Sequence, residues 1–167
     1  MTAPKLKTRD GSDLYDRHFY AWTQDQAERL RALTGADRID AAHMAEELED
    51  LGKREKRELE SHLQQFLAHL IKLAASPARS PRRHWFDEAN RAHADALLVL
   101  ADSPGLRQLL ELDRLWSSAC RFANRDLAKF DESGVPADLP CPVRFDALLH
   151  EEFDLSAAEA RIRDSVR

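Results

Sequence analysis

Carboxylate and imidazole side chains recur on what the sequence predicts to be an apolar helix stripe. Glu55, His62 and His69 are spaced by seven residues, and a helix that advances ~100° per residue brings such positions nearly into register. Glu58 stands one turn before His62. Helical bundles build metal sites from inward-facing Glu and His side chains, and zinc and iron both accept these ligands. One hypothesis is therefore a metal-binding bundle or a metal-dependent enzyme centred on these residues.

The same cluster has a plainer interpretation as a structural polar network, and we favour it. Buried polar groups need partners, so Glu55 would pair with Arg or Lys and each His with one neighbour. The sequence contains neither a Glu-x-x-His pair nor a His-Glu-x-x-His motif. A metal site would also need ligands from other helices. The further candidate donors are His18, His43 and Asp113.

A basic connector is the second group of residues that could do chemistry. Arg79, Arg82 and Arg83 are followed closely by Trp85, at a predicted helix start where the helix dipole also favours anions. A phosphate or an acidic partner could dock there, and arginine beside an aromatic ring can stack on a single-stranded base. The alternative, which we favour, is that Trp85 belongs to the core and the arginines are solvated or paired with acidic residues.

The chain contains no sequence motif for nucleophilic catalysis or for nucleotide binding. There is no Gly-x-Ser-x-Gly elbow and no phosphate-cradling Gly-x-x-x-x-Gly-Lys loop. Cys120 lies in a helical pattern and Cys141 in a proline-containing loop with His150 nearby, and both thiols are predicted to be unreactive. We predict no catalytic residue and no cofactor, and the balance leans against an enzyme.

The charge and composition disfavour several further classes of protein. The formal net charge is −5, which argues against a general nucleic-acid binder, because neutralising phosphates requires a basic face. Residues 1–7 lack the apolar core of a secretory signal, and no stretch approaches the ~20 apolar residues of a membrane span. Two cysteines without paired spacing are typical of a reducing compartment. We expect a cytoplasmic protein without a membrane segment.

Periodic apolar residues predict the helices that must position these side chains. The first spans about residues 14–33, with Asp13 as its N-cap and Gly35 after its end, since glycine accepts the left-handed conformation. The second spans about residues 41–74 and begins at Asp40 as N-cap. Its apolar stripe is predicted to face a core, and it consists of Met44, Leu48, Leu59, Phe66 and Leu73.

Glycine and proline decide the remaining boundaries. Gly52 lies inside the second pattern, but the apolar residues on both sides share one phase, so we predict one long helix that is bent or closely packed there. Two more helices begin at Ser-Pro pairs, because proline suits the first helical turn. One begins at Ser80, and the other runs from Ser103 to Phe130. Ser156 opens a capping-box pattern, which favours a short tail helix.

These elements predict an all-α protein, a bundle of about four main helices with a short C-terminal helical extension. The length of 167 residues is that of one domain. We expect a mobile N-terminal arm over residues 1–12, a single helical-bundle domain over residues 13–152 and a tail over residues 153–167.

Several ordered motifs carry a resemblance to a known family. They are residues 14–22 and 44–52, then Glu55, Glu58-Leu59, Ser61, His69-Leu70, Lys72, Trp85, Ser103-Pro104 and Leu139-Pro140-Cys141-Pro142. Over roughly residues 14–150 the chain resembles the domain-of-unknown-function 29 family. The resemblance implies a bacterial protein with a helical fold, and it implies no reaction.

The leading functional hypothesis is a non-enzymatic helical module that binds a protein partner or self-associates. Its support is a charge-rich surface together with the lack of catalytic motifs. The metal-binding bundle is the first alternative. A nucleic-acid-linked regulator that uses Arg79, Arg82, Arg83 and Trp85 is the second.

Overall fold

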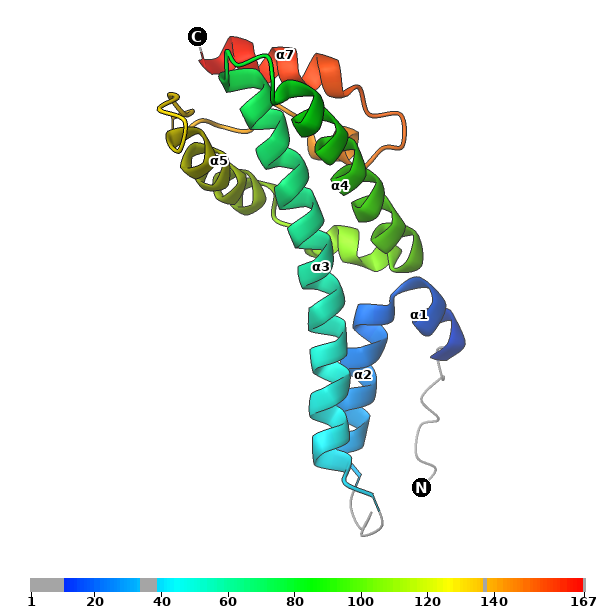
Figure 1. Ribbon diagram of the computed structural model, residues 1–167. Helices are drawn as coiled ribbons and strands as arrows, with labels where there is room; N and C mark the ends of the chain where they lie inside the picture. Colours follow the sequence, from blue (N-terminus) through cyan, green and yellow to red (C-terminus); the bar gives the residue numbers. More distant parts are fainter. Residues whose placement is uncertain (1–10, 34–38, 137, 167) are drawn as a thin grey trace. The chain divides into compact units, whose positions relative to one another are not determined.

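The computed structural model describes residues 11–33, 39–136 and 138–166, and every regular element within them is helical (Figure 1). In chain order these elements are α1 (Gly11–Arg17), α2 (Phe19–Arg31), α3 (Ala41–Ala75), α4 (Arg82–Asp102), the 3₁₀ helix η1 (Pro104–Leu109), α5 (Leu112–Ala128), α6 (Phe145–Leu148) and α7 (Leu155–Val166). The predicted all-α class is confirmed. Among the residues described, no helix is long and apolar enough to span a lipid bilayer.

The chain forms two compact units. The first unit consists of residues 1–57 and 99–109, and the second consists of residues 58–98 and 110–167. Helices α3 and α4 each contribute residues to both. The single domain expected over residues 13–152 stays a prediction, because compactness of two parts does not by itself show that they fold separately.

The predicted first helix over residues 14–33 is wrong in one respect, because it is broken at His18. That residue has φ −143° and ψ 54°, so α1 ends before it and α2 begins after it. The His18 ring lies against Gly105 of η1, where an added Cβ would be 2.3 Å from Nδ1. The predicted N-cap at Asp13 is also wrong, since α1 begins at Gly11. Gly35, the predicted stop, lies outside the described residues.

Helix α3 agrees closely with its predicted bounds and runs without a break through Gly52. The Asp40 side chain caps its N-terminus, accepting a hydrogen bond from the His43 backbone N–H at 3.2 Å. Gly52 is buried against Thr23 of α2. The glycine is therefore a close packing point rather than a break in the helix.

Two other predicted helix starts are shifted. The helix predicted from Ser103 to Phe130 is wrong as a single element: Ser103 precedes the short η1, and Glu111 has extended backbone before α5 begins. The interruption falls where the chain passes from the first unit to the second. At α7 the cap is Asp154, which accepts from the Ala157 N–H at 2.9 Å, so the capping box predicted at Ser156 is wrong.

The second unit holds most of the core. Buried apolar side chains line the second half of α3 and one face each of α4 and α5, and Figure 1 shows α4 and α5 beside this part of α3. They are Leu59, Leu63, Phe66, Leu67, Leu70, Ile71 and Leu73 of α3, Trp85, Ala89, Ala92 and Ala96 of α4, and Trp116, Ala119, Cys120, Ala123 and Leu127 of α5.

The loop that follows α5 is held by side chains of that helix. Asn124 donates from Nδ2 to the Val135 carbonyl and accepts the Val135 N–H at Oδ1, both at 2.8 Å. Gly134 fits directly over the amide, because an added Cβ would lie 2.2 Å from Asn124 Oδ1. Trp116 donates its indole N–H to the Leu139 carbonyl at 2.7 Å. The proline-containing loop is thus fixed at two points along α5.

Candidate interaction surface

Helices α2 and α3 pack closely in the first unit because small residues line their contact. Thr23 and Ala27 of α2 and Ala45 and Gly52 of α3 are all buried, and small side chains let two helices approach. Figure 1 shows α2 beside the first half of α3. The larger apolar side chains Met44 and Leu51 of this part of α3 are exposed.

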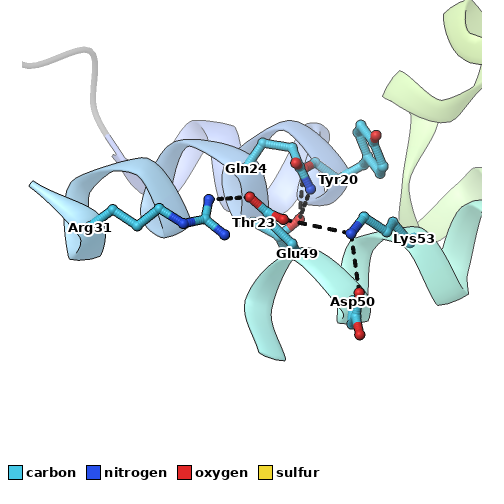
Figure 2. A network of polar contacts seen from close by, with 7 residues as sticks. All are labelled: Tyr20, Thr23, Gln24, Arg31, Glu49, Asp50 and Lys53. Atoms are coloured by element: carbon cyan, nitrogen blue, oxygen red, sulfur yellow. Dashed lines mark hydrogen bonds and ion pairs between the residues drawn. The ribbon is translucent and has the colours of Figure 1, made fainter. Parts of the chain in front are cut away.

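Polar side chains border the same contact. Figure 2 shows Arg31 of α2 paired with Glu49 of α3, and Lys53 paired with Glu49 and Asp50. Lys53 Nζ lies 3.6 Å from Glu49 Oε2 and 3.2 Å from Asp50 Oδ1. The Thr23 hydroxyl donates to the Tyr20 carbonyl at 2.7 Å. The ion pairs lie at the solvent edge, where each contributes little stability. Of these pairs, Arg31–Glu49 joins the two helices, and the Lys53 pairs lie within α3.

Another side of α3 carries an apolar groove that we call the α3 strip. Its residues recur every three or four positions and line a hollow of about 450 Å³: Asp40, His43, Met44, Glu47, Leu48, Leu51 and Arg54. Met44 is 48% and Leu51 44% exposed. The sequence predicted that Met44 and Leu48 continue the core-facing stripe of Leu59 and Phe66, and for Met44 this is wrong. The reason is that α2 covers the small-residue side of α3 instead.

Charge is distributed unevenly along the α3 strip. Asp40 lies at its N-terminal end and Arg54 at its C-terminal end, with Glu47 between them. Arg54 Nη2 lies 3.9 Å from Glu47 Oε2. His43 Nδ1 lies 2.5 Å from Asp40 Oδ2, and this hydrogen bond raises the pKa of His43 and lowers the pKa of the Asp40 carboxyl. The strip therefore has the Asp40–His43 pair at its N-terminal end, and Arg54, one side of which is near Glu47, at its C-terminal end.

The structure does not assemble the predicted cluster of Glu55, Glu58, His62 and His69 into a metal centre. The Ser103 hydroxyl donates to Glu55 Oε1 at 2.6 Å. His62 Nε2 lies 3.9 Å from Glu58 Oε1, a carboxylate whose side chain is 61% exposed. Among the described residues no group of three or more His, Cys, Asp or Glu side chains could hold a metal ion.

The remaining candidate donors have other surroundings. His18 lies against Gly105, His43 contacts Asp40, and Asp113 is exposed in the first turn of α5. Spacing along one helix predicted that the members of the cluster share a face, but it could not show which side chains of other helices lie beside them.

His69 is the member of that cluster with the most unusual environment. Burial is the main cause that lowers its pKa to about 4, and the nearby positive charge of Lys72 adds to the effect. Its Nδ1 is buried without a hydrogen-bond partner among the described residues. The His84 ring centroid is 6.5 Å away. A neutral imidazole follows at neutral pH, which is consistent with the structural interpretation.

Sequence reasoning missed a partly buried ion pair one turn from His69. Lys72 has only 8% of its side chain exposed, and its Nζ lies 3.1 Å from Asp126 Oδ2 of α5. The same ammonium lies 5.6 Å from the centroid of the Trp85 ring, within the range of a cation–π interaction. The signal in the sequence was a lone lysine inside the apolar run Leu70 to Leu73, which demands a partner when buried.

The predicted basic patch is divided by the fold. Arg82 donates to the Leu73 carbonyl at 2.7 Å and pairs with Glu159 of α7 at 2.6 Å. Trp85 is buried, as the structural interpretation expected. Arg83 has 94% of its side chain exposed, and Arg79 is also exposed. Arg82 and Trp85 therefore belong to the packing of the second unit, whereas Arg79 and Arg83 are on its surface, where Arg83 Nε lies 4.0 Å from Asp87 Oδ2.

The two cysteines are poorly suited to nucleophilic chemistry. Cys120 is buried, and burial raises the pKa of its thiol to about 11. The Cys141 thiol donates to the Val143 carbonyl at 3.4 Å, and burial also raises its pKa. Because the thiolate is the reactive form, both environments disfavour a nucleophile.

The fold defines an all-α protein with an exposed groove on its longest helix, and comparison with known proteins agrees on the class. The chain belongs to the family described as "Domain of unknown function DUF29", whose model matches residues 14–154. The predicted resemblance is confirmed. The chain is also similar to the crystal structure of an α-helical protein of unknown function from Rhodospirillum rubrum, with 31% sequence identity and a TM-score of 0.75. The match covers 88% of this chain and 96% of that one. No curated protein matches the sequence.

Proposed function

We propose that the chain is a non-enzymatic helical module that binds a protein helix, from a partner or from itself, along the α3 strip. The observation that carries the proposal is a row of apolar side chains on one helix face, bordered by charges: Met44 and Leu51 are exposed, and Leu48 between them is half-buried. An amphipathic helix recognises such a groove through residues spaced three and four apart.

Contiguity distinguishes this row from other exposed apolar residues. Leu98 is 65% and Phe130 68% exposed, but single exposed apolar side chains are normal on a protein surface. The α3 strip instead places three apolar side chains side by side over about two helical turns, around a hollow. Covering them with a second apolar helix would remove that surface from water.

Photo-crosslinking in cells that naturally produce the protein tests the proposal. A photoreactive amino acid at position 51 should give covalent adducts that contain a second protein chain, and Leu48→Asp in the same chain should abolish them. The matched control carries the same photoreactive residue at Leu98, which is more exposed but lies outside the strip. Equal labelling at both positions, or no adduct at position 51, would show that the strip does not bind a protein.

A further inference from the structure

We propose that the occupant of the α3 strip is a second copy of this chain, whose α3 binds in the antiparallel direction. This inference rests on the proposed function and names the partner that it leaves open. A two-fold symmetric interface uses the same surface on both copies, so the surface must complement itself. The distribution of apolar and charged residues along the strip meets that requirement.

The charges at the two ends of the strip are opposite. Asp40 and Arg54 are fourteen residues apart, about 21 Å along a helix axis. When two strips overlap in antiparallel directions, Asp40 of each copy faces Arg54 of the other, which gives two attractive pairs. A parallel pair would instead place Asp40 against Asp40 and Arg54 against Arg54. Charges bordering an apolar seam set the orientation of paired helices, so the antiparallel direction is favoured.

The apolar residues agree with the same arrangement. Met44 and Leu51 lie on opposite sides of Leu48 along the helix, so an antiparallel overlap places Met44 of one copy near Leu51 of the other, with Leu48 near the two-fold axis. Glu47 then approaches Glu47 of the second copy, and the nearby Arg54 of its own chain partly offsets their repulsion. The strip thus complements itself in its apolar pattern and in the charges of its two ends, whereas the Glu47–Glu47 contact opposes the pairing.

The size of the strip sets the strength of the dimer. Three apolar side chains on one helix cover less than the ~1,200–2,000 Å² of a standard stable interface, so we expect a dissociation constant on the order of 10–100 µM. Such a dimer forms reversibly with concentration. The first unit itself contributes few large buried side chains, since its own helix contact uses Thr23, Ala27, Ala45 and Gly52.

Sedimentation equilibrium of the full chain tests the proposal over about 10 µM to 1 mM, the range in which a small interface associates. The wild type should pass from monomer to dimer. Leu48→Asp should weaken the dimer at least about tenfold, because it places a charge at the axis. Arg54→Glu should weaken it about tenfold, since two attractions become repulsions. Arg57→Glu, the same charge change at an exposed α3 position outside the strip, should leave the association unchanged.

A pair of conservative variants tests the contact between the two ends. Asp40→Asn keeps a residue that caps helices well, and Arg54→Gln keeps the length of the side chain. Each should weaken the dimer a few-fold, and the double variant should weaken it no more than either single variant does. Equal and additive effects would show that the two residues do not face each other and would overturn the proposed orientation.

Cysteine crosslinking tests the direction of the helices independently. Chains carrying Met44→Cys and chains carrying Leu51→Cys are mixed and oxidised, and a disulfide forms only when the two Cα atoms approach within about 7 Å. The antiparallel arrangement predicts mainly the mixed product, whereas a parallel one predicts products that join like chains.

The outcomes separate the two proposals. A strictly monomeric chain at every concentration, together with a photo-adduct to a different protein at position 51, overturns self-association and supports partner binding. A monomer without any adduct overturns both.

Discussion

Thr23 of α2 and Gly52 of α3 lie so close that a Cβ on residue 52 would be 2.3 Å from Thr23 Oγ1. Alanine in a helix normally stabilises it by about 1 kcal/mol relative to glycine, but crowding in a packed contact costs about 1–3 kcal/mol. We therefore expect Gly52→Ala to lower the free energy of unfolding by about 1 kcal/mol, measured by urea denaturation. In a Thr23→Ala background the same substitution should become stabilising. A gain in the wild-type background would show that the helices are not in contact here.

Arg82 and Arg83 are neighbours in sequence with opposite roles. Arg82→Ala should lower the free energy of unfolding by about 1–3 kcal/mol, because it leaves the Leu73 carbonyl and the Glu159 carboxylate without this donor. Arg83→Ala should change it by no more than about 0.5 kcal/mol, since the side chain is almost fully exposed. Similar losses in the two variants would contradict the division of the basic patch.

The Lys72–Asp126 pair should respond asymmetrically to the loss of one partner. Asp126→Asn leaves a buried ammonium without its counter-charge, and we expect a loss of about 1–3 kcal/mol, below the value for fully buried pairs because Asp126 is a third exposed. Lys72→Met should cost less than about 1 kcal/mol, since Met packs in similar volume and Asp126 keeps Lys129 at 2.9 Å. Thermal or urea unfolding of both variants measures which substitution costs more stability.

The environment of His69 should make the protein less stable as the pH falls. Burial lowers the pKa of His69 from 6.5 to about 4, so between these values the unfolded chain binds a proton that the folded chain does not. The contribution of His69 to the free energy of unfolding is therefore complete above about pH 6.5, and it declines as the pH falls toward 4. Burial lowers the pKa of His93 in the same direction.

Urea titrations at pH 7 and pH 5 measure this effect, and His69→Gln should reduce the difference between the two. His43→Gln is the matched comparison. Asp40 raises the pKa of His43, so stability from this histidine is present below pH 6.5 and is lost as the pH rises through the folded-state pKa. The His43→Gln substitution should therefore not reduce the difference in stability between pH 7 and pH 5. If His69→Gln left the pH dependence as large as in the wild type, His69 would not be the group that titrates.

Local patterns predicted the helices well where the packing is local. The continuous α3 and its Asp40 cap follow from residues a few positions apart. The break at His18 depends instead on Gly105, and the interruption before α5 occurs where the chain changes unit. Neither feature is encoded in the periodicity of the neighbouring residues.

The candidate site also depends on contacts between residues far apart in the sequence, which local patterns do not reveal. Ser103 reaches Glu55 across 48 residues of sequence, and Arg82 reaches Glu159 across 77. Helical spacing placed Glu55, His62 and His69 near one face, but it did not reveal these distant partners. It also assigned Met44 to the core. This is wrong because α2 packs against a different side of α3, the side that carries Ala45 and Gly52.

The Asn124 side chain binds both backbone groups of Val135, so it needs an oxygen and an NH₂ group at once. Hydrolysis of this amide to aspartate would replace the donor by a second acceptor, and a carboxylate oxygen would then face the Val135 carbonyl. Chemical ageing of one side chain would thereby loosen the proline-containing loop from α5 without cutting the chain.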